Sequence, residues 1–551
     1  MKKTALTILL AVATCFAAYS QGAYDAWLFS ENNYEGTART VAMGNAFTAL
    51  GGDLGAVTIN PASSAVAGYS QLTLTPSLTF SANTATGVPY EGSADPYFQK
   101  TMKSRMTKAG IPNIGFTFDF KTGRSSGLKN MTFGFIVNRT NSWCEDVFAE
   151  GTNSQTSFLA AAASDATASG FSKDELMSED AYRFADWKDI VGYRSGMFSA
   201  YDAEGKEFVA ATETLLDNGD IMQSGTVEQK YGRSVLGNKY EYLFNFGANI
   251  SDFVYVGVNL GINSISYDYT HYFKESAIDP DLFENIFVDS NGQEYATYFQ
   301  KATYKHSYSA DGTGIFGKLG VIVTPGHGLR FGAAIQTPTS TTITEKWQDM
   351  ASTSFTDAGS DGEAESDLGE SRYTFNAPWR FNFGIAYTLG KFAAISADYE
   401  AADYGGKRYH IDRHDMSEGD IEYFEDVNED IRNAYGTVHQ LRVGAELKPL
   451  SFLAIRAGYN LKTAAQKKEY DFTEEEYIDT KPVYYQNLSF GLGYSSKKSF
   501  FADLACRYTF ASEEFIYPYS DYLYEQKGIL SPEILNIHSN WKLLLTLGWR
   551  F

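Results

Sequence analysis

The segment His538–Phe551, HSNWKLLLTLGWRF, decides the fold of this chain. Its apolar side chains occupy every second position, namely Leu543, Leu545, Leu547, Trp549 and Phe551. Polar or small residues lie between them, and Leu544 is the one exception. Alternation with a period of two predicts a strand with one apolar and one polar face. The sequence ends on the apolar face, so we expect that face to contact lipid and the polar face to line a lumen.

The same alternation recurs along the chain from Gln71 onward. We count about fourteen such runs, an even number as bacterial single-chain barrels require. Short connections such as 251–253 and 325–328 alternate with long ones, of which 140–238 is the largest. This alternation is typical of periplasmic turns and outer loops. The sequence therefore predicts an all-β protein, a 14-stranded antiparallel transmembrane β-barrel over residues 71–551.

Composition and charge agree with a barrel and exclude other classes. The chain has 38 Tyr, 39 Phe and 49 Gly, which suit aromatic girdles and a lumen that must leave room. The mean hydropathy is −0.28, and after Ser20 no apolar run approaches the ~20 residues that a helical span needs. The net charge of −22 argues against nucleic acid as a partner.

Residues 1–20 read as a secretory signal peptide. Lys2 and Lys3 precede the apolar run Ala5–Ala18, and small residues follow it. A lipoprotein signal using Cys15 is the alternative, although Thr14 fits its cleavage box poorly. The mature chain keeps only Cys144 and Cys506, so we expect no disulfide framework.

Residues 21–70 do not alternate like the rest of the chain. Thr37–Leu50 has helical spacing and ends at Gly51-Gly52, and Asn60-Pro61-Ala62 follows. A segment this small cannot bury a core of its own, so it needs a host. We expect the barrel lumen to be that host, with residues 21–70 as a plug, or hatch.

Charged residues occupy the polar faces of the predicted strands. They include Arg330, Arg380, Arg442, Glu446, Arg456 and Arg507. Two interpretations stay open for them: an ion-pair lattice that holds the plug, and direct contact with a solute.

Gly36–Ala67 resembles the N-terminal hatch of the FadL/TodX family of outer-membrane transporters for long-chain fatty acids and hydrophobic compounds. Leu329–Ser340, Ala377–Leu389 and Leu441–Leu461 are also similar to segments of that family, and the terminal strand resembles the last strand of bacterial outer-membrane barrels. By this resemblance the hatch and gating residues are Gly44, Asn45, Gly51, Gly52, Asp53, Asn60, Pro61 and Ala62. Turn geometry is the competing explanation for the glycines and Asn60.

The resemblance implies passive, non-enzymatic transport in the outer membrane of a Gram-negative bacterium. Hydrophobic small molecules, fatty acids or aromatic compounds, would be captured by outer loops, pass the hatch and leave sideways into the membrane through a gap at a kinked strand. The implied partners are this ligand and outer-membrane lipid. We expect a monomer with no cofactor and no catalytic residues.

The long loop 140–238 departs from the family, and its segments Ser157–Ala163 and Lys173–Trp187 have helical character. A further helix is predicted at Pro280–Phe287, and its apolar residues are a candidate capture surface or a stripe that packs on its own loop. They are Leu282, Phe283, Ile286 and Phe287. The alternative function is that of a scaffold or shuttle barrel, as in the type IX secretion relatives of the family, with loop 140–238 binding surface or secreted proteins.

Three weaker motifs do not support another chemistry. Gly123–Gly127 fits a nucleophile elbow but lies in a short predicted turn without a His/Asp pair. His410 and His414 with Asp412 and Asp415 lie in an exposed acidic loop, and Asp426–Asp430 lacks the glycine of a calcium loop. We therefore expect no metal site.

Overall fold

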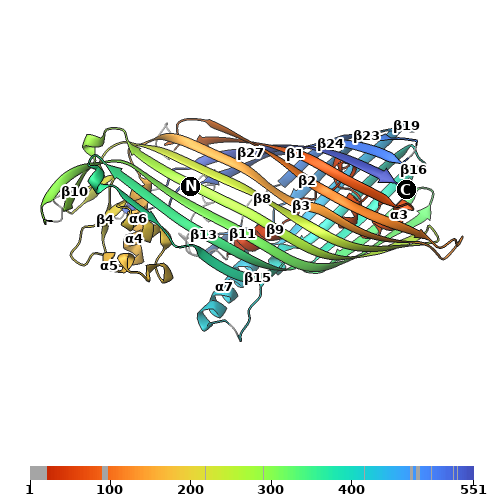
Figure 1. Cartoon of the computed structure of the whole chain (residues 1–551), viewed down its shortest axis with the longest axis horizontal. Coiled ribbons are helices and arrows are strands. Elements are labelled where there is room, and N and C mark those ends of the chain that lie inside the picture. The colour runs from red at the N-terminus through yellow and green to blue at the C-terminus, as the bar shows by residue number, and fades with distance from the viewer. Residues whose placement is uncertain are drawn as a thin grey trace.

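A computed structural model of the chain shows fourteen antiparallel strands closed into a barrel (Figure 1). β1 pairs with both β2 and β27, which closes the ring. The predicted fold class is therefore confirmed. The structure describes residues 22–89, 97–216, 219–288, 291–414, 416–471, 476–479, 484–497, 499–520, 522–524, 527–529 and 531–551. The predicted signal peptide and Asp415 lie outside these residues.

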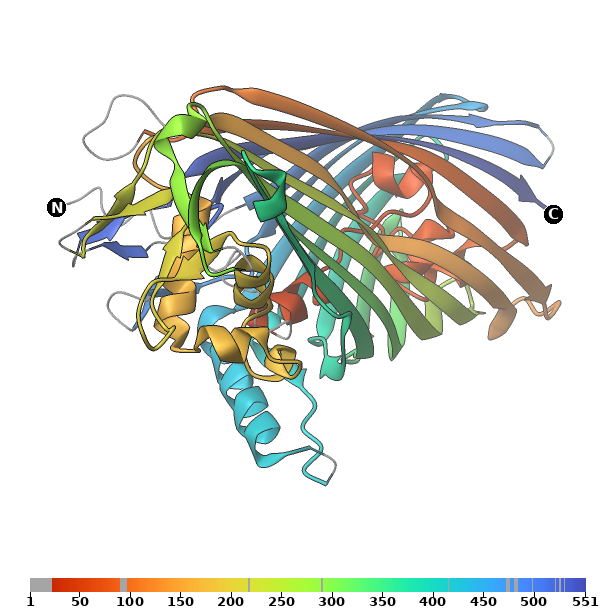
Figure 2. The same ribbon diagram turned by 60° about the vertical axis from the view of Figure 1, so that its left-hand side comes forward.

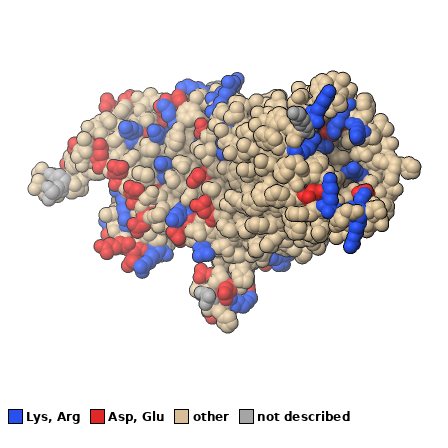
Figure 3. All heavy atoms as spheres, turned by 45° about the vertical axis from the view of Figure 1, so that its right-hand side comes forward, with Lys and Arg blue, Asp and Glu red and all other residues tan. Residues whose placement is uncertain are grey.

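Alternating exposure along each strand follows the period-two pattern of the sequence. The wall consists of β1 (Gln71–Gly87), β2 (Met102–Lys121), β3 (Leu128–Asn153), β8 (Val227–Ile250), β9 (Val254–Ala277), β11 (Glu294–Gly326), β12 (Leu329–Gln336), β13 (Ser340–Phe355), β15 (Gly369–Asn376), β16 (Arg380–Leu389), β17 (Ala393–Asp403), β18 (Arg408–Tyr409), β19 (Thr437–Leu450), β20 (Leu453–Thr463), β23 (Tyr484–Ser495), β24 (Phe500–Ile516) and β27 (Ile534–Arg550). The outward residues form a belt almost free of charge between two charged ends (Figure 3). This belt is the lipid-facing surface that the alternation predicts.

Two neighbouring wall strands are interrupted at the same level. β12 continues as β13 after residues 337–339, and β15 continues as β16 after residues 377–379. β17 likewise continues as the short β18, so the seventeen segments form fourteen strands. Gln336 pairs with Arg380 below the interruption, and Ser340 pairs with Asn376 above it. Pro338 and Pro378 explain the breaks, because proline cannot donate to a ladder hydrogen bond.

The outer rim of the barrel is uneven. β8 and β9 have 24 residues each and β11 has 33, whereas β17, β20 and β23 have only 11 or 12. A membrane span needs about 9–11 strand residues, so the short strands end near the outer membrane surface. The long strands continue outward as a curved wall (Figure 1).

The N-terminal segment 22–68 lies inside the barrel (Figure 2). It contains α1 (Ala23–Ser30), α2 (Ala38–Ala42), η3 (Gly55–Thr58) and α3 (Ser63–Ala67). The helix predicted over Thr37–Leu50 is limited to α2, because the chain turns at Gly44 and Asn45 with φ of 62° and 63°. Leu544, the exception in the terminal strand, points inward and packs on Ala38 and Val41.

The outer loops carry the remaining elements. They are β4 (Phe198–Ala200), β5 (Phe208–Ala210), β6 (Glu213–Leu215), β7 (Ile221–Gln223), β10 (Glu284–Val288), β14 (Gly362–Glu365), β21 (Lys468–Asp471), β22 (Glu476–Asp479), β25 (Tyr522–Tyr524), β26 (Lys527–Ile529), α4 (Phe158–Ser169), α5 (Lys173–Met177), α6 (Trp187–Arg194), α7 (Glu418–Ala434), η4 (Ala181–Arg183), η5 (Pro280–Leu282), η6 (Ala358–Ser360) and η7 (Tyr404–Gly406). The helix predicted at Pro280–Phe287 is wrong: only η5 is helical, and β10 pairs with β11. The spacing of the apolar residues favoured a helix, but pairing of β10 with β11 makes this segment a strand.

Candidate functional site

Asn60 joins the N-terminal segment to the barrel wall. It is fully buried, and its Nδ2 donates to the carbonyl oxygens of Thr48 at 2.7 Å and Val321 at 3.1 Å. Its Oδ1 accepts from the backbone N–H of Ala62 at 3.0 Å, which fixes the turn over Pro61. One side chain therefore sets both the local turn and the position of the segment against β11.

The other predicted hatch residues build turns. Gly51 and Gly52 have φ of 62° and 75°, the left-handed region that glycine adopts without strain. Asn45 donates to the carbonyl oxygen of Tyr34 at 3.0 Å. Asp53 accepts a hydrogen bond from the hydroxyl of Thr37 at 2.6 Å and another from the backbone N–H of Gly55. These contacts are those of a rigid, hydrogen-bonded segment.

A ring of wall glycines lets the backbone of the N-terminal segment contact the strands directly. A Cβ atom at any of them would lie under 3.0 Å from an atom of residues 42–64. They are Gly247, Gly257, Gly320, Gly332, Gly384, Gly444, Gly458 and Gly491. Gly332 and Gly384 are cross-strand partners and both face Thr48. Each of these glycines occupies a lumen-facing position of its strand, but strand alternation alone does not identify it as a contact with the N-terminal segment.

Three buried carboxylates organise the charges of the lumen. Glu35 is bound by Arg139, Arg507 and Lys542. Three cations on one carboxylate leave an excess of positive charge around it. Partnered buried charges of this kind are tolerable only when geometry and hydrogen bonds offset desolvation.

The second cluster is centred on Glu400. Its carboxylate binds Arg380 at 3.1 Å and Arg442 at 3.0 Å. Arg380 also donates to the carbonyl oxygen of Ser30 at 2.6 Å. The cluster therefore connects β16, β17 and β19 to the end of α1.

The third cluster is centred on Glu446. It binds Arg456 at 2.6 Å and Arg39 of the N-terminal segment at 2.9 Å. Arg456 also binds Asp503 at 2.6 Å. All six predicted lumen residues thus lie inside the barrel, and Arg330 donates to the carbonyl oxygen of Leu50 at 2.7 Å.

Sequence reasoning missed the partners that come from the N-terminal segment. Glu35 and Arg39 complete two of the ion clusters, yet neither lies on an alternating strand. Their signal in the sequence is that they are charged residues in a segment, 21–70, that is expected to be buried.

Apolar side chains fill the outer half of the lumen beside α1. We call this group the rim cluster, and its core is Ala26, Leu28, Phe29, Val235, Ile265, Tyr267, Ala310, Ile343, Tyr373, Phe375, Ala377, Ala402, Tyr404, Tyr409, Phe424, Val427, Ile431, Tyr435, Val438 and Ala465. Phe29 of α1 makes edge-to-face contacts with Trp143 and Tyr267. Phe424 and Ile431 come from α7, which projects sideways from the barrel (Figure 2). The rim cluster therefore runs from the lumen to the outside, at the level where the short strands end.

A second apolar cluster lies farther out, under the long loop. It joins α4 and α6 to the inner faces of the long strands, for example through Phe158 against Phe273 and Tyr304. Glu213 of β6 lies near this cluster, and burial raises the pKa of its carboxyl to about 7. The long loop is thus a packed domain. Helical character is predicted at Ser157–Ala163 and Lys173–Trp187, and the structure has α4 near the first segment and α5 and α6 near the second.

The four candidate capture residues divide between the two faces of their hairpin. Phe283 is fully buried, and Phe287 packs on Phe355. Leu282 and Ile286 are 53% and 59% exposed. The hairpin therefore brings only two of the four to the surface together.

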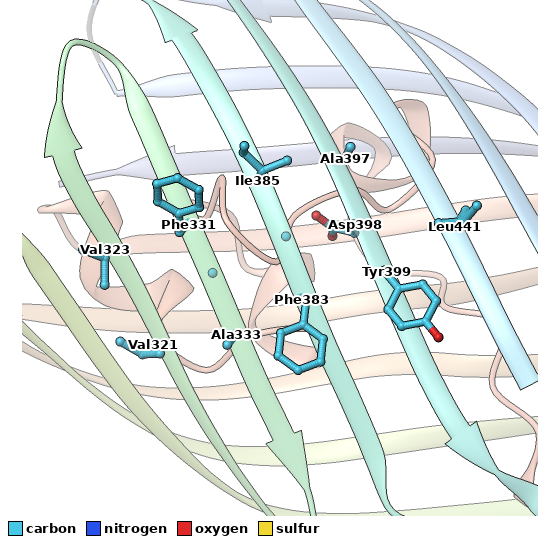
Figure 4. Close-up of a pocket in the computed structure, with 12 residues that line it drawn as sticks. Val321, Val323, Phe331, Ala333, Phe383, Ile385, Ala397, Asp398, Tyr399 and Leu441 are labelled. Carbon is cyan, nitrogen blue, oxygen red and sulfur yellow. The ribbon is translucent and has the colours of Figure 1, made fainter. Parts of the chain in front are cut away.

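A shallow apolar groove of about 590 Å³ lies on the outer surface of the wall (Figure 4). Its floor is the backbone at Gly332, Ala333 and Gly384, and side chains such as Phe331 and Phe383 flank it. Thr48 contacts the other side of this floor, so the wall here is one backbone thick.

No group of three or more His, Cys, Asp or Glu side chains in the described residues could hold a metal ion. Within the same residues, no helix is long and apolar enough to cross a membrane. Gly123–Gly127 lies in a turn between β2 and β3, away from any described strand-to-helix elbow.

Comparison with known proteins finds similar solved structures, but no protein-family model and no curated protein matches the chain. The chain is similar to the Pseudomonas putida toluene transporter TodX, with 12% identity, a TM-score of 0.49 and coverage of 94% of this chain and 98% of that one. It is also similar to a Pseudomonas aeruginosa FadL homologue (11% identity, TM-score 0.47, coverage 94% and 99%). The Ralstonia pickettii toluene transporter TbuX has 13% identity and a TM-score of 0.43, with coverage of 94% and 98%.

Proposed function

We propose that this protein is an outer-membrane channel for passive transport of hydrophobic small molecules. The observation that carries the proposal is the division of the lumen. The inner half is filled by the ion-paired N-terminal segment, and the outer half holds the rim cluster, which continues to the outside of the barrel. A polar plug blocks water-filled diffusion, whereas a continuous apolar region offers an uncharged solute a path that avoids water.

In this proposal residues 22–68 act as the hatch. Asn60 and the ring of wall glycines hold its backbone against β11, β12 and β16. Exchange of these polar contacts would let the segment shift, since no disulfide among the described residues ties it to the wall. This dependence on polar contacts supports a gating role for residues 22–68.

We place the lateral exit at the double strand break. β15 meets β18 through only two residue pairs, Phe375 with Tyr409 and Asn376 with Arg408. Phe375 and Tyr409 both belong to the rim cluster, and α7 packs over them. This is the shortest ladder between neighbouring wall strands and it lies on the apolar route, so it is the weakest point for lateral passage.

The test is uptake of labelled oleate and of labelled toluene by vesicles that contain the purified protein. We expect flux in the parent, and a changed flux in Asn60→Ala. A Phe375→Cys/Tyr409→Cys disulfide should reduce the flux, and reduction should restore it. Paired strand residues lie at distances that a disulfide can span.

The matched control is Ser307→Cys/Gln348→Cys, a pair on β11 and β13 away from the break. Both pairs are made in a background with Cys144→Ala and Cys506→Ser. If vesicles take up neither solute, the transport proposal is wrong. If surface proteins then co-purify through loop 140–238, the scaffold alternative replaces it.

A further inference from the structure

The end of the barrel that carries the short turns is basic, although the chain as a whole has a net charge of −22. Figure 3 shows Lys and Arg side chains gathered at this end, beyond the belt that is almost free of charge. The short connections 121–129, 251–253, 325–328, 389–391, 448–451 and 496–498 contain one acidic residue, Asp252, and seven basic residues: Lys121, Arg124, Lys129, Lys391, Lys448, Lys497 and Lys498. Basic side chains at a membrane surface attract anionic lipid head groups.

The apolar groove on the outer surface of the wall lies on the strands that two of these turns connect (Figure 4). It forms because two outward-facing alanines lie among larger side chains. Ala333 pairs with Val321 on one side and Phe383 on the other, and Ala397 pairs with Ile385. At these two positions the lipid-facing surface leaves room for a flexible hydrocarbon chain.

The depth of the groove matches one leaflet of a membrane. Ile385 lies six residues before Lys391, which is about 20 Å of strand. Because barrel strands tilt by about 35–45°, this length corresponds to roughly 15 Å of depth, half of a hydrocarbon core about 30 Å thick. An acyl chain with its head group at Lys391 therefore reaches the groove.

The charges around the groove favour an anionic head group. Lys448 lies beside the turn of Lys391, since its backbone N–H donates to the carbonyl oxygen of Phe392 at 2.7 Å. Asp398 lines the floor of the groove, but its carboxylate lies on the lumen side and accepts from the N–H of Thr48 at 2.7 Å.

Glu446 is the carboxylate nearest to Lys448, at 3.3 Å, and it is already bound by Arg39 and Arg456. It therefore does not neutralise the lysines. The surface is positively charged at the membrane boundary and apolar above it, which is the pattern that an anionic phospholipid matches.

We propose that the groove and Lys391 form a binding site for one anionic phospholipid of the periplasmic leaflet. One acyl chain fills the groove, and the phosphate lies at Lys391 with Lys448 beside it. This lipid is a resident partner and not cargo, so the site does not depend on the transport function. Thr48 contacts the other side of the groove floor, so the chain supports the wall where the N-terminal segment presses on it. A ligand that binds only the folded state stabilises it by mass action.

The test uses the purified protein in nanodiscs of equal amounts of palmitoyl-oleoyl phosphatidylglycerol and phosphatidylcholine. Native mass spectrometry counts the lipids that stay bound when the protein is released. We expect the parent to retain phosphatidylglycerol about fivefold more often than phosphatidylcholine, the effect of one basic residue at an anionic lipid surface. Ala397→Phe fills the groove and should abolish retention of both lipids. Lys391→Gln should keep a bound lipid but lose most of the preference.

Two variants serve as matched controls. Ala457→Phe adds the same ring to an exposed alanine of β20 that does not line the groove, and Lys121→Gln removes an exposed lysine at another turn. Both should retain lipid as the parent does. A parent that retains no more lipid than Ala397→Phe holds only annular lipid, and the proposal is then wrong. A preference that survives unchanged in Lys391→Gln also overturns it. Displacement of the retained phosphatidylglycerol by added oleate would assign the groove to cargo and overturn the resident lipid as well.

Discussion

The inner and outer halves of the lumen are both buried, but different forces hold them. In the inner half, ion pairs and backbone contacts with glycine fix the N-terminal segment. In the outer half, aromatic and aliphatic side chains pack around α1. Directional polar contacts favour a single seating, whereas apolar packing tolerates rearrangement when volume is kept. The inner half is therefore held in one position, whereas the side chains of the outer half can rearrange.

The largest loss of stability is expected for Glu35→Gln. The change leaves Arg139, Arg507 and Lys542 buried without their carboxylate, which costs about 3–5 kcal/mol of unfolding free energy. Urea unfolding in lipid vesicles measures the loss, and proteolysis reports release of the N-terminal segment. The control Glu425→Gln removes an exposed pair with Arg413 and should change stability by about 0–1 kcal/mol. Equal effects of both variants would show that the inner half does not depend on its ion pairs.

Phe29→Ala tests the outer half. The ring is 1% exposed and contacts Trp143 and Tyr267, so its loss should cost about 3 kcal/mol. We expect α1 to loosen while residues 35–68 stay resistant to protease. Met177→Ala, at a residue 58% exposed in the long loop, is the control. Cleavage within residues 35–68 of the Phe29 variant would contradict separate support of the two halves.

Gly332→Ala tests whether the N-terminal segment presses directly on the barrel wall. The added Cβ would collide with the backbone at Thr48, an overpacking that costs about 1–3 kcal/mol. The same Cβ at Gly317 has its nearest neighbour 3.9 Å away, so Gly317→Ala is the matched control. Differential scanning calorimetry of both variants measures the difference. A Gly332 variant as stable as the control would mean that the segment does not press on the wall.

The smallest change in stability is expected at Glu213, which lies in the long loop 140–238. Its folded-state pKa of about 7 lies above the ordinary value of 4.5, so its stabilising contribution is complete below pH 4.5 and is lost as pH rises through 7. Glu213→Gln should remove this dependence, a difference of about 1 kcal/mol or more between pH 5 and pH 8. Hydrogen exchange of β6 and β7 in parent and variant measures it. A parent loop that becomes more protected with rising pH would contradict the sign.

The sequence predicted most of the wall and part of the candidate site. Strand alternation reports which face of each strand meets lipid, so the barrel and the lumen positions of residues such as Arg442 and Arg507 could be read directly. The ion partners could not, because Glu35 and Arg139 are 104 residues apart. The helix prediction at Pro280–Phe287 was wrong for a related reason. The apolar spacing of this segment fits a helix, and only its pairing with β11 makes it a strand.

The sequence by itself determined the closed barrel, because period-two alternation and loop lengths are local properties of a chain. Only the tertiary structure decided where the wall is weak and what the lumen can hold. The double break needs Pro338 and Pro378 to meet on adjacent strands. The polar cavity lined by Arg507 and Lys542 needs six strands and the N-terminal segment to converge. Such sites depend on distances between residues far apart in the sequence, and folding alone sets those distances.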